Sequence, residues 1–415
     1  MKIKNLILTI LTLPAFIFAQ GGSTYTQYGI GDLNHSFSAR RLAIGEFGAA
    51  LSDYNNLNSL NPAAWSNLTL TRFEAGYEFS STEISNEAVS GRYNESSFSG
   101  FKFGFPLERG YGISLVLGLV PYSNVNYEVV KAESNADVVS NGASRTFSGE
   151  GGLSRLFVGS SYKLPFDFSI GASFEYYTGK IDYNSAIRFV DQSDFINTSF
   201  LNSYKYEGIG YSIGLISNDF AELMGLEKID ELRLGFAFSY VSDLKTDTSL
   251  SAATSIGTKF IESATVKTSL PYRFDAGLSF RFNKKVLFVM DYFFQNWSDY
   301  KFNSTESPFL QDQKIYSFGF EFSEPRDQYS SFWEQMMFRG GLSYEQTQYL
   351  INGEGINQYS VYAGVSFPLS VENSFDVGFQ YGIRGTKENN LLKENIFKTT
   401  FSLSFGELWF VRKER

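Results

Sequence analysis

Residues 273–282, with the sequence RFDAGLSFRF, decide the fold of this chain. Every second residue is apolar, namely Phe274, Ala276, Leu278, Phe280 and Phe282. The residues between them are arginine, aspartate, glycine and serine, so one face of the segment is apolar and the other is polar or small. A period of two is typical of a β-strand whose faces meet different surroundings. The segment also has the roughly 9–11 residues that a tilted strand needs to cross a membrane.

The same alternation recurs along the chain and predicts an all-β protein. Clear examples are residues 73–79 and 375–383, where phenylalanine, tyrosine and aliphatic residues alternate with charged residues, glycine and glutamine. We expect strands at about 68–82, 95–106, 110–130, 144–163, 166–189, 202–217, 231–246, 264–282, 285–302, 313–323, 336–348, 357–368, 373–386 and 395–409. An even count returns the last strand beside the first and places both chain ends on the periplasmic side. The prediction is a transmembrane antiparallel β-barrel of about 14 strands.

A secreted β-sandwich or a repeat array would also show alternation, and the composition weighs against both. Sandwich strands are usually about 5–6 residues long, and several segments here are much longer. The chain has 42 Phe, 26 Tyr and 4 Trp among 415 residues. Aromatic girdles at the two membrane interfaces account for such an excess. No repeat of about 20–50 residues supports a solenoid or propeller.

Both ends of the chain carry export signals. Lys2 and Lys4 precede an apolar stretch at residues 6–18, and Ala19 follows it. This is the layout of a secretory signal peptide over residues 1–19. The last expected strand ends in Trp409 and Phe410, an aromatic ending that outer-membrane insertion machinery recognises. We therefore expect a bacterial outer-membrane protein, a monomer, in contact with outer-membrane lipid and with the barrel assembly machinery during biogenesis.

The composition excludes several kinds of chemistry. Cysteine is absent, so disulfides, thiol nucleophiles and Cys/His zinc sites are excluded. A net charge of -9 argues against a nucleic-acid partner, whose phosphates need a basic surface. A serine hydrolase would have to use His35, the one histidine, which lies in a glycine-rich loop without a nucleophile elbow. We expect no enzymatic activity, no catalytic residue, no metal and no cofactor.

Residues 20–66 do not alternate. They are rich in glycine, contain aromatic residues such as Tyr25 and Trp65, and close with Asn61, Pro62 and Ala63. A disordered leader would not need these aromatic side chains, and the barrel lumen is the nearest place to bury them. The predicted division is a signal peptide at 1–19, a short N-terminal plug (hatch) in the lumen at 20–66, and a transmembrane barrel at 67–415.

The sequence resembles the FadL-type outer-membrane transporters of long-chain fatty acids and other hydrophobic compounds, in their Bacteroidetes-like form. The matching features, in chain order, are YGIGDL at 28–33, Asn61-Pro62-Ala63, the 14 strands, the signatures between Leu270 and Ser298, and Leu408-Trp409-Phe410. The resemblance covers essentially the whole mature chain. It implies a plug that fills the barrel from the periplasmic end and whose characteristic tripeptide is Asn61, Pro62 and Ala63. No local match extends to the ligand-contacting side chains of that family.

Candidate cargo-lining residues follow from the strand register. If Phe288, Met290, Tyr292 and Phe294 face lipid, then Leu287, Val289 and Phe293 point into the lumen, and Val116 and Val120 form a similar inward pair. Apolar side chains facing the lumen suit a hydrophobic solute, although packing against the plug would explain them equally. Pro121 and Pro271 each remove a ladder donor, and a kink at either could open a lateral gap.

These observations predict an outer-membrane channel for passive, ligand-gated uptake of hydrophobic small molecules such as long-chain fatty acids or aromatic hydrocarbons. The alternative is a FadL-like accessory or structural barrel of a protein secretion or surface-assembly system. The sequence separates the two poorly and does not identify the cargo.

Overall fold

The computed structural model describes residues 22–35, 37–132, 144–189, 196–324, 331–370 and 372–408. The predicted signal peptide and the aromatic ending at Trp409 and Phe410 lie outside these residues. Within them, no helix is both long enough and apolar enough to pass through a membrane.

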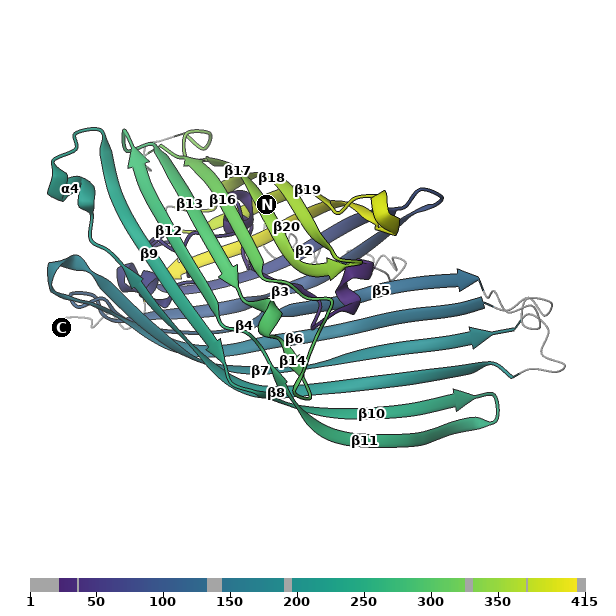
Figure 1. Cartoon of the computed structure of the whole chain (residues 1–415). Coiled ribbons are helices and arrows are strands. Elements are labelled where there is room, and N and C mark those ends of the chain that lie inside the picture. The colour runs from purple at the N-terminus through teal and green to yellow at the C-terminus, as the bar shows by residue number, and fades with distance from the viewer. Residues whose placement is uncertain are drawn as a thin grey trace, which may run out of the picture.

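The chain folds as one closed antiparallel sheet (Figure 1). Its strands are β1 (Asp32–Leu33), β2 (Thr71–Ser85), β3 (Ser90–Glu108), β4 (Ile113–Pro121), β5 (Ser123–Ala132), β6 (Ser144–Lys163), β7 (Ser169–Arg188), β8 (Thr198–Ile216), β9 (Ile229–Val241), β10 (Leu244–Thr254), β11 (Gly257–Ser269), β12 (Arg273–Phe282), β13 (Val286–Gln295), β14 (Lys301–Phe302), β15 (Thr305–Glu306), β16 (Gln313–Phe322), β17 (Met337–Ile351), β18 (Glu354–Pro368), β19 (Ser374–Arg384) and β20 (Lys393–Glu407). The short helices are η1 (Thr24–Gln27), α2 (Ala39–Ala43), η2 (Pro62–Asn67), η3 (Pro165–Asp167), α4 (Phe220–Met224), η4 (Trp297–Asp299) and η5 (Glu388–Asn390). Pairing of β2 with β20 along their whole length closes the barrel.

The barrel wall has the 14 strands that the sequence predicts, when β4–β5, β9–β10, β11–β12 and β13–β14 are each counted as one. The prediction of unbroken strands at 110–130, 231–246, 264–282 and 285–302 is wrong, because each is interrupted. The first break follows Pro121 and the third contains Pro271, residues that cannot donate to a strand ladder. At the fourth break, Trp297 begins the turn η4.

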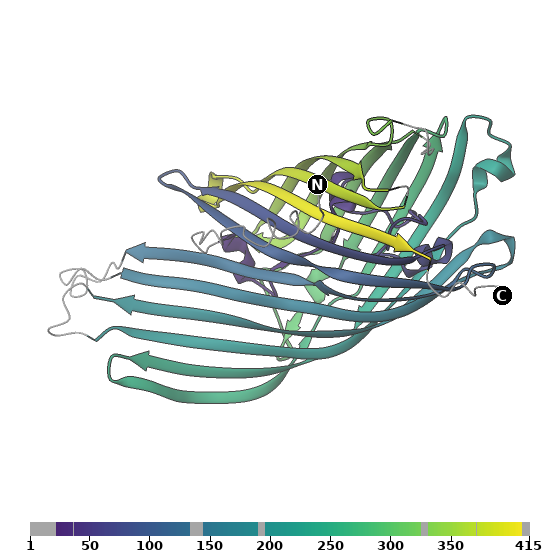
Figure 2. The ribbon, with the colours of Figure 1, turned by 180° about the vertical axis from the view of Figure 1, so that it is seen from behind.

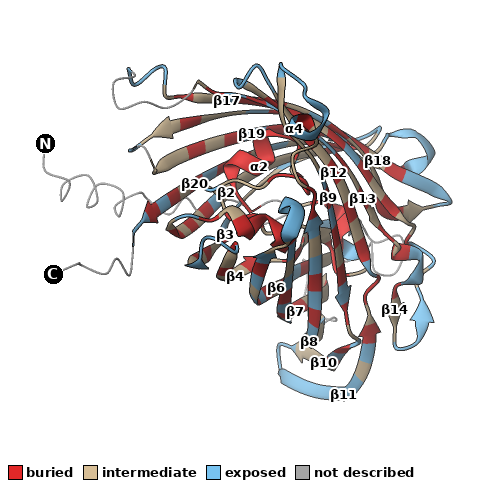
Figure 3. Ribbon diagram, turned by 90° about the vertical axis from the view of Figure 1, so that its left-hand side faces the viewer, coloured by how far each residue is buried: buried red, intermediate tan, exposed pale blue. Residues whose placement is uncertain are grey.

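The alternation of the strands separates a polar interior from an apolar exterior. In β12, Arg273, Asp275, Gly277 and Ser279 are buried inside the barrel, and the apolar residues between them, Phe274, Ala276 and Leu278, are more exposed. Figure 3 shows the same alternation of buried and exposed residues on the other strands. An apolar outer band with a polar lumen is the arrangement of a transmembrane barrel.

One side of the barrel is much taller than the other. The strands β6 and β7 have 20 residues each, whereas β12, β13 and β16 have 10. At about 3.4 Å per residue, the long strands exceed an apolar band of about 25 Å by a wide margin. Their ends form a one-sided extension, which we call the projecting sheet: residues 123–132, 144–152, 180–188, 198–207, 244–254 and 257–267 (Figures 1 and 2).

Candidate functional site

Residues 22–67, the N-terminal segment, lie inside the ring of strands. Figure 3 shows α2 of this segment surrounded by the wall, with most of its surface buried. Its helices are short and capped by side chains: Ser38 accepts a hydrogen bond from the Arg41 amide at 3.4 Å. Five residues are too few for a helix to be stable alone, so packing against the wall must hold α2 in place.

The tripeptide Asn61-Pro62-Ala63 anchors the end of the segment. The Asn61 side-chain oxygen accepts a hydrogen bond from the Ala63 amide at 3.0 Å and so caps η2. Its side-chain nitrogen lies 2.7 Å from the Ala49 carbonyl oxygen, and 3.2 and 3.3 Å from those of Leu215 and Phe236 in the wall. Asn61 therefore joins two parts of the segment to β8 and β9, and its side chain is fully buried.

A belt of glycines on the inner wall receives the segment. A Cβ atom at Gly214 would lie under 3.0 Å from the Asn61 side chain, and one at Gly235 would collide with the Ala49 backbone. Other wall glycines have the same relation to the segment: Gly76, Gly104, Gly171, Gly319, Gly341, Gly364 and Gly378; at Gly277 a Cβ atom would lie 3.1 Å from Ala49 and Ala50. Because real Cβ atoms essentially never approach so closely, the wall is fitted to the segment around most of the barrel.

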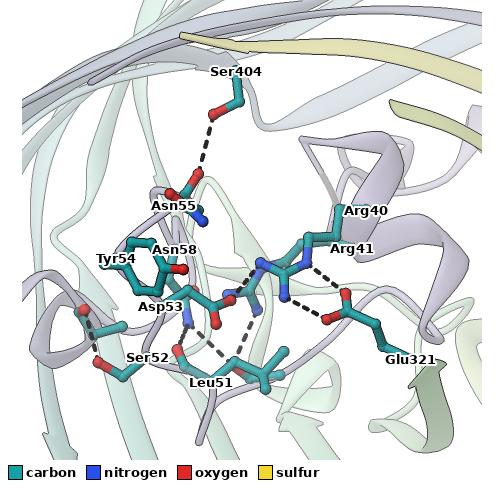
Figure 4. Close-up of polar contacts among 12 residues, drawn as sticks. Arg40, Arg41, Leu51, Ser52, Asp53, Tyr54, Asn55, Asn58, Glu321 and Ser404 are labelled. Carbon is teal, nitrogen blue, oxygen red and sulfur yellow. Dashed lines mark hydrogen bonds and ion pairs between the residues drawn. The ribbon is translucent and has the colours of Figure 1, made fainter. Parts of the chain in front are cut away.

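An ionic network ties α2 to the opposite wall (Figure 4). Arg40 donates two hydrogen bonds to the Glu321 carboxylate, at 2.9 and 3.0 Å, and also pairs with Asp53. Arg339 donates to the same carboxylate at 2.7 Å. Glu321 is 2% exposed, so two guanidinium groups compensate the burial of its charge.

Further polar contacts hold both ends of the segment. Asp32 pairs with Arg384 at 2.9 Å and accepts a hydrogen bond from the Tyr349 hydroxyl at 2.7 Å. Near the other end, the Glu74 carboxylate accepts from the Leu57 amide at 2.7 Å and pairs with Lys102 at 3.0 Å. Removing Glu74 would leave the buried Lys102 ammonium without its carboxylate partner.

The predicted cargo-lining residues all point inward and are buried. Leu287 and Val289 pack with Ile44 and Leu51 of the segment. Phe293 packs with Phe47 and Leu60.

Val116 and Val120 belong to a third cluster, with Phe37, Leu57 and Trp65. In this structure, all five residues form the apolar seat of the N-terminal segment. Their part in holding a cargo stays a prediction.

His35 is packed rather than placed for catalysis. Its ring lies 4.8 Å from the Phe293 ring and 5.2 Å from the Phe47 ring. Burial, followed by the charge of Arg273, lowers the pKa of His35 to about 3. A neutral imidazole between two phenylalanines is suited to filling space in the segment. Within the described residues, no group of three or more potential metal ligands is present.

A lateral gap opens where the strand breaks at Pro121. Residues 101–108 of β3 pair with β4, but among the described residues 90–100 have no strand partner on that side. There β5 pairs instead with β1 of the segment, through Asn124 and Ser123. A side-chain hydrogen bond of 2.9 Å from Asn124 to Glu95 bridges the gap.

Two cavities meet at this gap, and their linings are mostly polar. The inner one, of about 210 Å³, is lined by residues that include His35, Glu46, Glu345 and Lys398. The outer one, of about 550 Å³, is lined by residues that include Asn94, Ser96 and Glu150. Both cavities are lined by Glu95, Pro121, Ser123, Asn124 and Asn126.

Sequence reasoning located the tripeptide and the inward strand faces but missed the glycine belt and the ionic network. A signal was present, because Gly277 and Gly319 lie on the polar register of strongly alternating strands. The partners of these glycines could not be read from the sequence.

The BamG family model matches residues 1–414 of this chain. No curated protein matches it. Solved structures with the same fold include the following three. The CymD monoaromatic hydrocarbon channel has a TM-score of 0.59 and 17% identity, with 90% of this chain and 98% of that chain covered. The toluene transporter TbuX of Ralstonia pickettii has a TM-score of 0.60 and 16% identity, with 90% and 99% covered. A FadL homologue of Pseudomonas aeruginosa has a TM-score of 0.57 and 13% identity, with 89% and 97% covered.

Proposed function

This chain belongs to the BamG family, and from that premise we propose that it is an accessory barrel of a machinery that assembles or delivers proteins at the bacterial outer-membrane surface. In this proposal, residues 1–19 direct export, residues 20–66 are a resident plug, and the barrel is a non-enzymatic monomer within a larger assembly. The prefix of the family name is that of the barrel assembly machinery, which agrees with the proposal.

The observation that carries the proposal is the polar, fitted seal of the lumen. The segment is held by the glycine belt, by buried ion pairs such as Arg40 with Glu321, and by the apolar seats around Phe293 and Val116. The cavities that remain along the segment are lined by carboxylates, amides and hydroxyls. An apolar molecule gains roughly 25 cal/mol per Å² when its surface leaves water for an apolar environment. Beside polar groups it would not gain this free energy. A conduit for hydrocarbons would place apolar side chains there.

The projecting sheet supports the same role. At its base, three lysine–acid pairs follow one another on adjacent strands: Lys180 with Asp182, Lys205 with Glu207, and Lys245 with Asp247. More than half of each of these lysine side chains is exposed, which suits water rather than lipid. The sheet beyond them carries further exposed side chains, such as Ile256 and Phe260. Diffusion through a pore does not require such a surface, whereas docking of a partner protein does.

The test is a depletion strain in which the amounts of other outer-membrane and surface proteins are measured by quantitative proteomics. We expect these amounts to fall while uptake of labelled hexadecanoate and toluene is unchanged. A variant lacking residues 249–262, the tip of the β10–β11 hairpin in the projecting sheet, should show the same fall in outer-membrane and surface proteins while its barrel still folds. A shorter control deletion, of residues 387–390 in the turn between β19 and β20, should not.

The second candidate is the passive, ligand-gated uptake of hydrophobic compounds such as long-chain fatty acids or aromatic hydrocarbons. The lateral gap between β3 and β5 favours it, because a route through the wall lets an apolar molecule reach the bilayer without crossing water. The fold, shared with hydrocarbon channels, is compatible with it. In this candidate, Leu287, Val289, Phe293, Val116 and Val120 would contact cargo after the segment moves. Loss of labelled toluene or fatty-acid uptake on depletion, with normal surface proteins, would favour this function over the first.

A further inference from the structure

A small cavity at the centre of the lumen has an unusual lining. It measures about 20 Å³ and lies between the segment and three parts of the wall, with Ser99 from β3, Arg155 from β6 and Arg273 from β12. Asn34 and His35 line it from the segment. It shares the lining residues Asn34, His35 and Pro121 with the 210 Å³ cavity, so the two cavities are neighbours.

Three buried donors in this lining have no partner in the described part of the chain. They are the Nε atoms of Arg155 and Arg273 and the hydroxyl of Ser99. The three side chains belong to residues that are 6%, 9% and 5% exposed. A buried donor without an acceptor costs about 1–3 kcal/mol, and more when it is charged. All three side chains line the cavity, so an acceptor held there would lie among them.

The two guanidinium groups differ in how far their charges are balanced. Arg155 pairs with Glu175 at 3.0 Å and donates to the Ser59 carbonyl oxygen at 3.2 Å. The Glu175 carboxylate is already shared with the hydroxyls of Tyr177 and Ser212. Among the described residues, Arg273 has no carboxylate within 4.0 Å, although Asp275 lies two positions along the same strand face. A buried guanidinium without a paired anion is strongly unfavourable.

We propose that this cavity is a binding site for a small inorganic anion of the halide class, held by Arg273, Arg155 and Ser99. The volume fits one particle of about the size of a water molecule and excludes larger anions such as a fatty-acid carboxylate with its chain. The anion would bridge wall strands on opposite sides of the segment, so it would stabilise the seated segment. This site is independent of the function proposed above.

The test uses the full mature chain purified in detergent, with bromide as the probe. Crystals grown in sodium bromide should show one anomalous peak within hydrogen-bond distance of Arg273, and the unfolding midpoint should rise with bromide concentration relative to gluconate at equal ionic strength. The variant Arg273→Gln should lose both effects. The control Arg281→Gln, at the other end of β12, removes an ion pair with Glu231 and should keep both.

If Arg273→Gln does not fold, Ser99→Ala provides a milder test. It removes one donor and should weaken the bromide dependence of the midpoint several-fold. A cavity that holds only water in bromide crystals would overturn the proposal. An equal bromide response in the wild type and in both site variants would also overturn it.

Discussion

Among single residues, Asn61 connects two parts of the segment to two wall strands. The variant Asn61→Ala would leave the Ala63 amide and the carbonyl oxygens of Ala49, Leu215 and Phe236 without this partner. We expect a loss of about 1–3 kcal/mol in the free energy of unfolding. The measurement is the midpoint of heat-induced unfolding in detergent. The control is Asn67→Ala. Asn67 lies at the end of η2 and contacts Ser52, and its loss should lower the free energy of unfolding less.

His35 predicts a pH dependence with a definite sign. Its pKa is about 3 in the folded chain against an ordinary value of 6.5, because burial disfavours the charged ring. The unfolded chain therefore binds more protons between these pH values, and the stability contributed above pH 6.5 is lost as the pH falls towards 3. The loss is at most about 1.4 kcal/mol per pH unit.

The measurement is the difference in unfolding midpoint between the wild type and His35→Gln at several pH values. This difference should shift steadily against the wild type from pH 6.5 downwards. Carboxylates that titrate in both proteins cancel from the comparison. A difference that is constant from pH 7 to pH 4 would contradict the prediction.

At the scale of elements, the strands and the segment fit each other through glycine. In Gly319→Ala the new methyl group would meet the Ile44 backbone at under 3.0 Å, a contact that cannot relax by a side-chain rotation. We expect a destabilisation of about 1–3 kcal/mol and new protease cleavage within residues 22–67. Gly91→Ala on β3 is the control, because its methyl group would meet only a tyrosine side chain, at 3.4 Å or more. Equal protease resistance in both variants would show that the segment is not fitted to the wall at Gly319.

The strands were predictable because each obeys a local rule. Period-two alternation in residues 273–282 depends only on which side faces lipid, so β12 and most of its neighbours could be located from the sequence. The departure of β5 from β3 after Pro121 could not, because it depends on β1 pairing with β5 instead. The contact of Gly319 with Ile44 joins distant parts of the chain and leaves no local pattern. The candidate site was therefore predictable in its inward residues and its tripeptide, but not in its ion pairs.

At the scale of the whole molecule, the segment lies inside the barrel. Deletion of residues 20–66 removes Arg40, Asn61 and the apolar side chains that occupy the lumen. If the segment acts as a plug, the deletion should raise outer-membrane permeability to polar dyes. The measurement is dye entry into cells that express the deletion variant at a level matched to the full chain. Unchanged entry with a folded barrel would reject the plug.

The proposed assembly role rests on the packed N-terminal segment and on the projecting sheet. The most direct measurement is quantitative proteomics of the outer membrane during depletion of this chain. The account predicts that other outer-membrane and surface proteins decrease as the chain is lost, and that re-expression of the wild type, but not of the variant lacking residues 249–262, restores them. Unchanged levels of those proteins after complete depletion would contradict it.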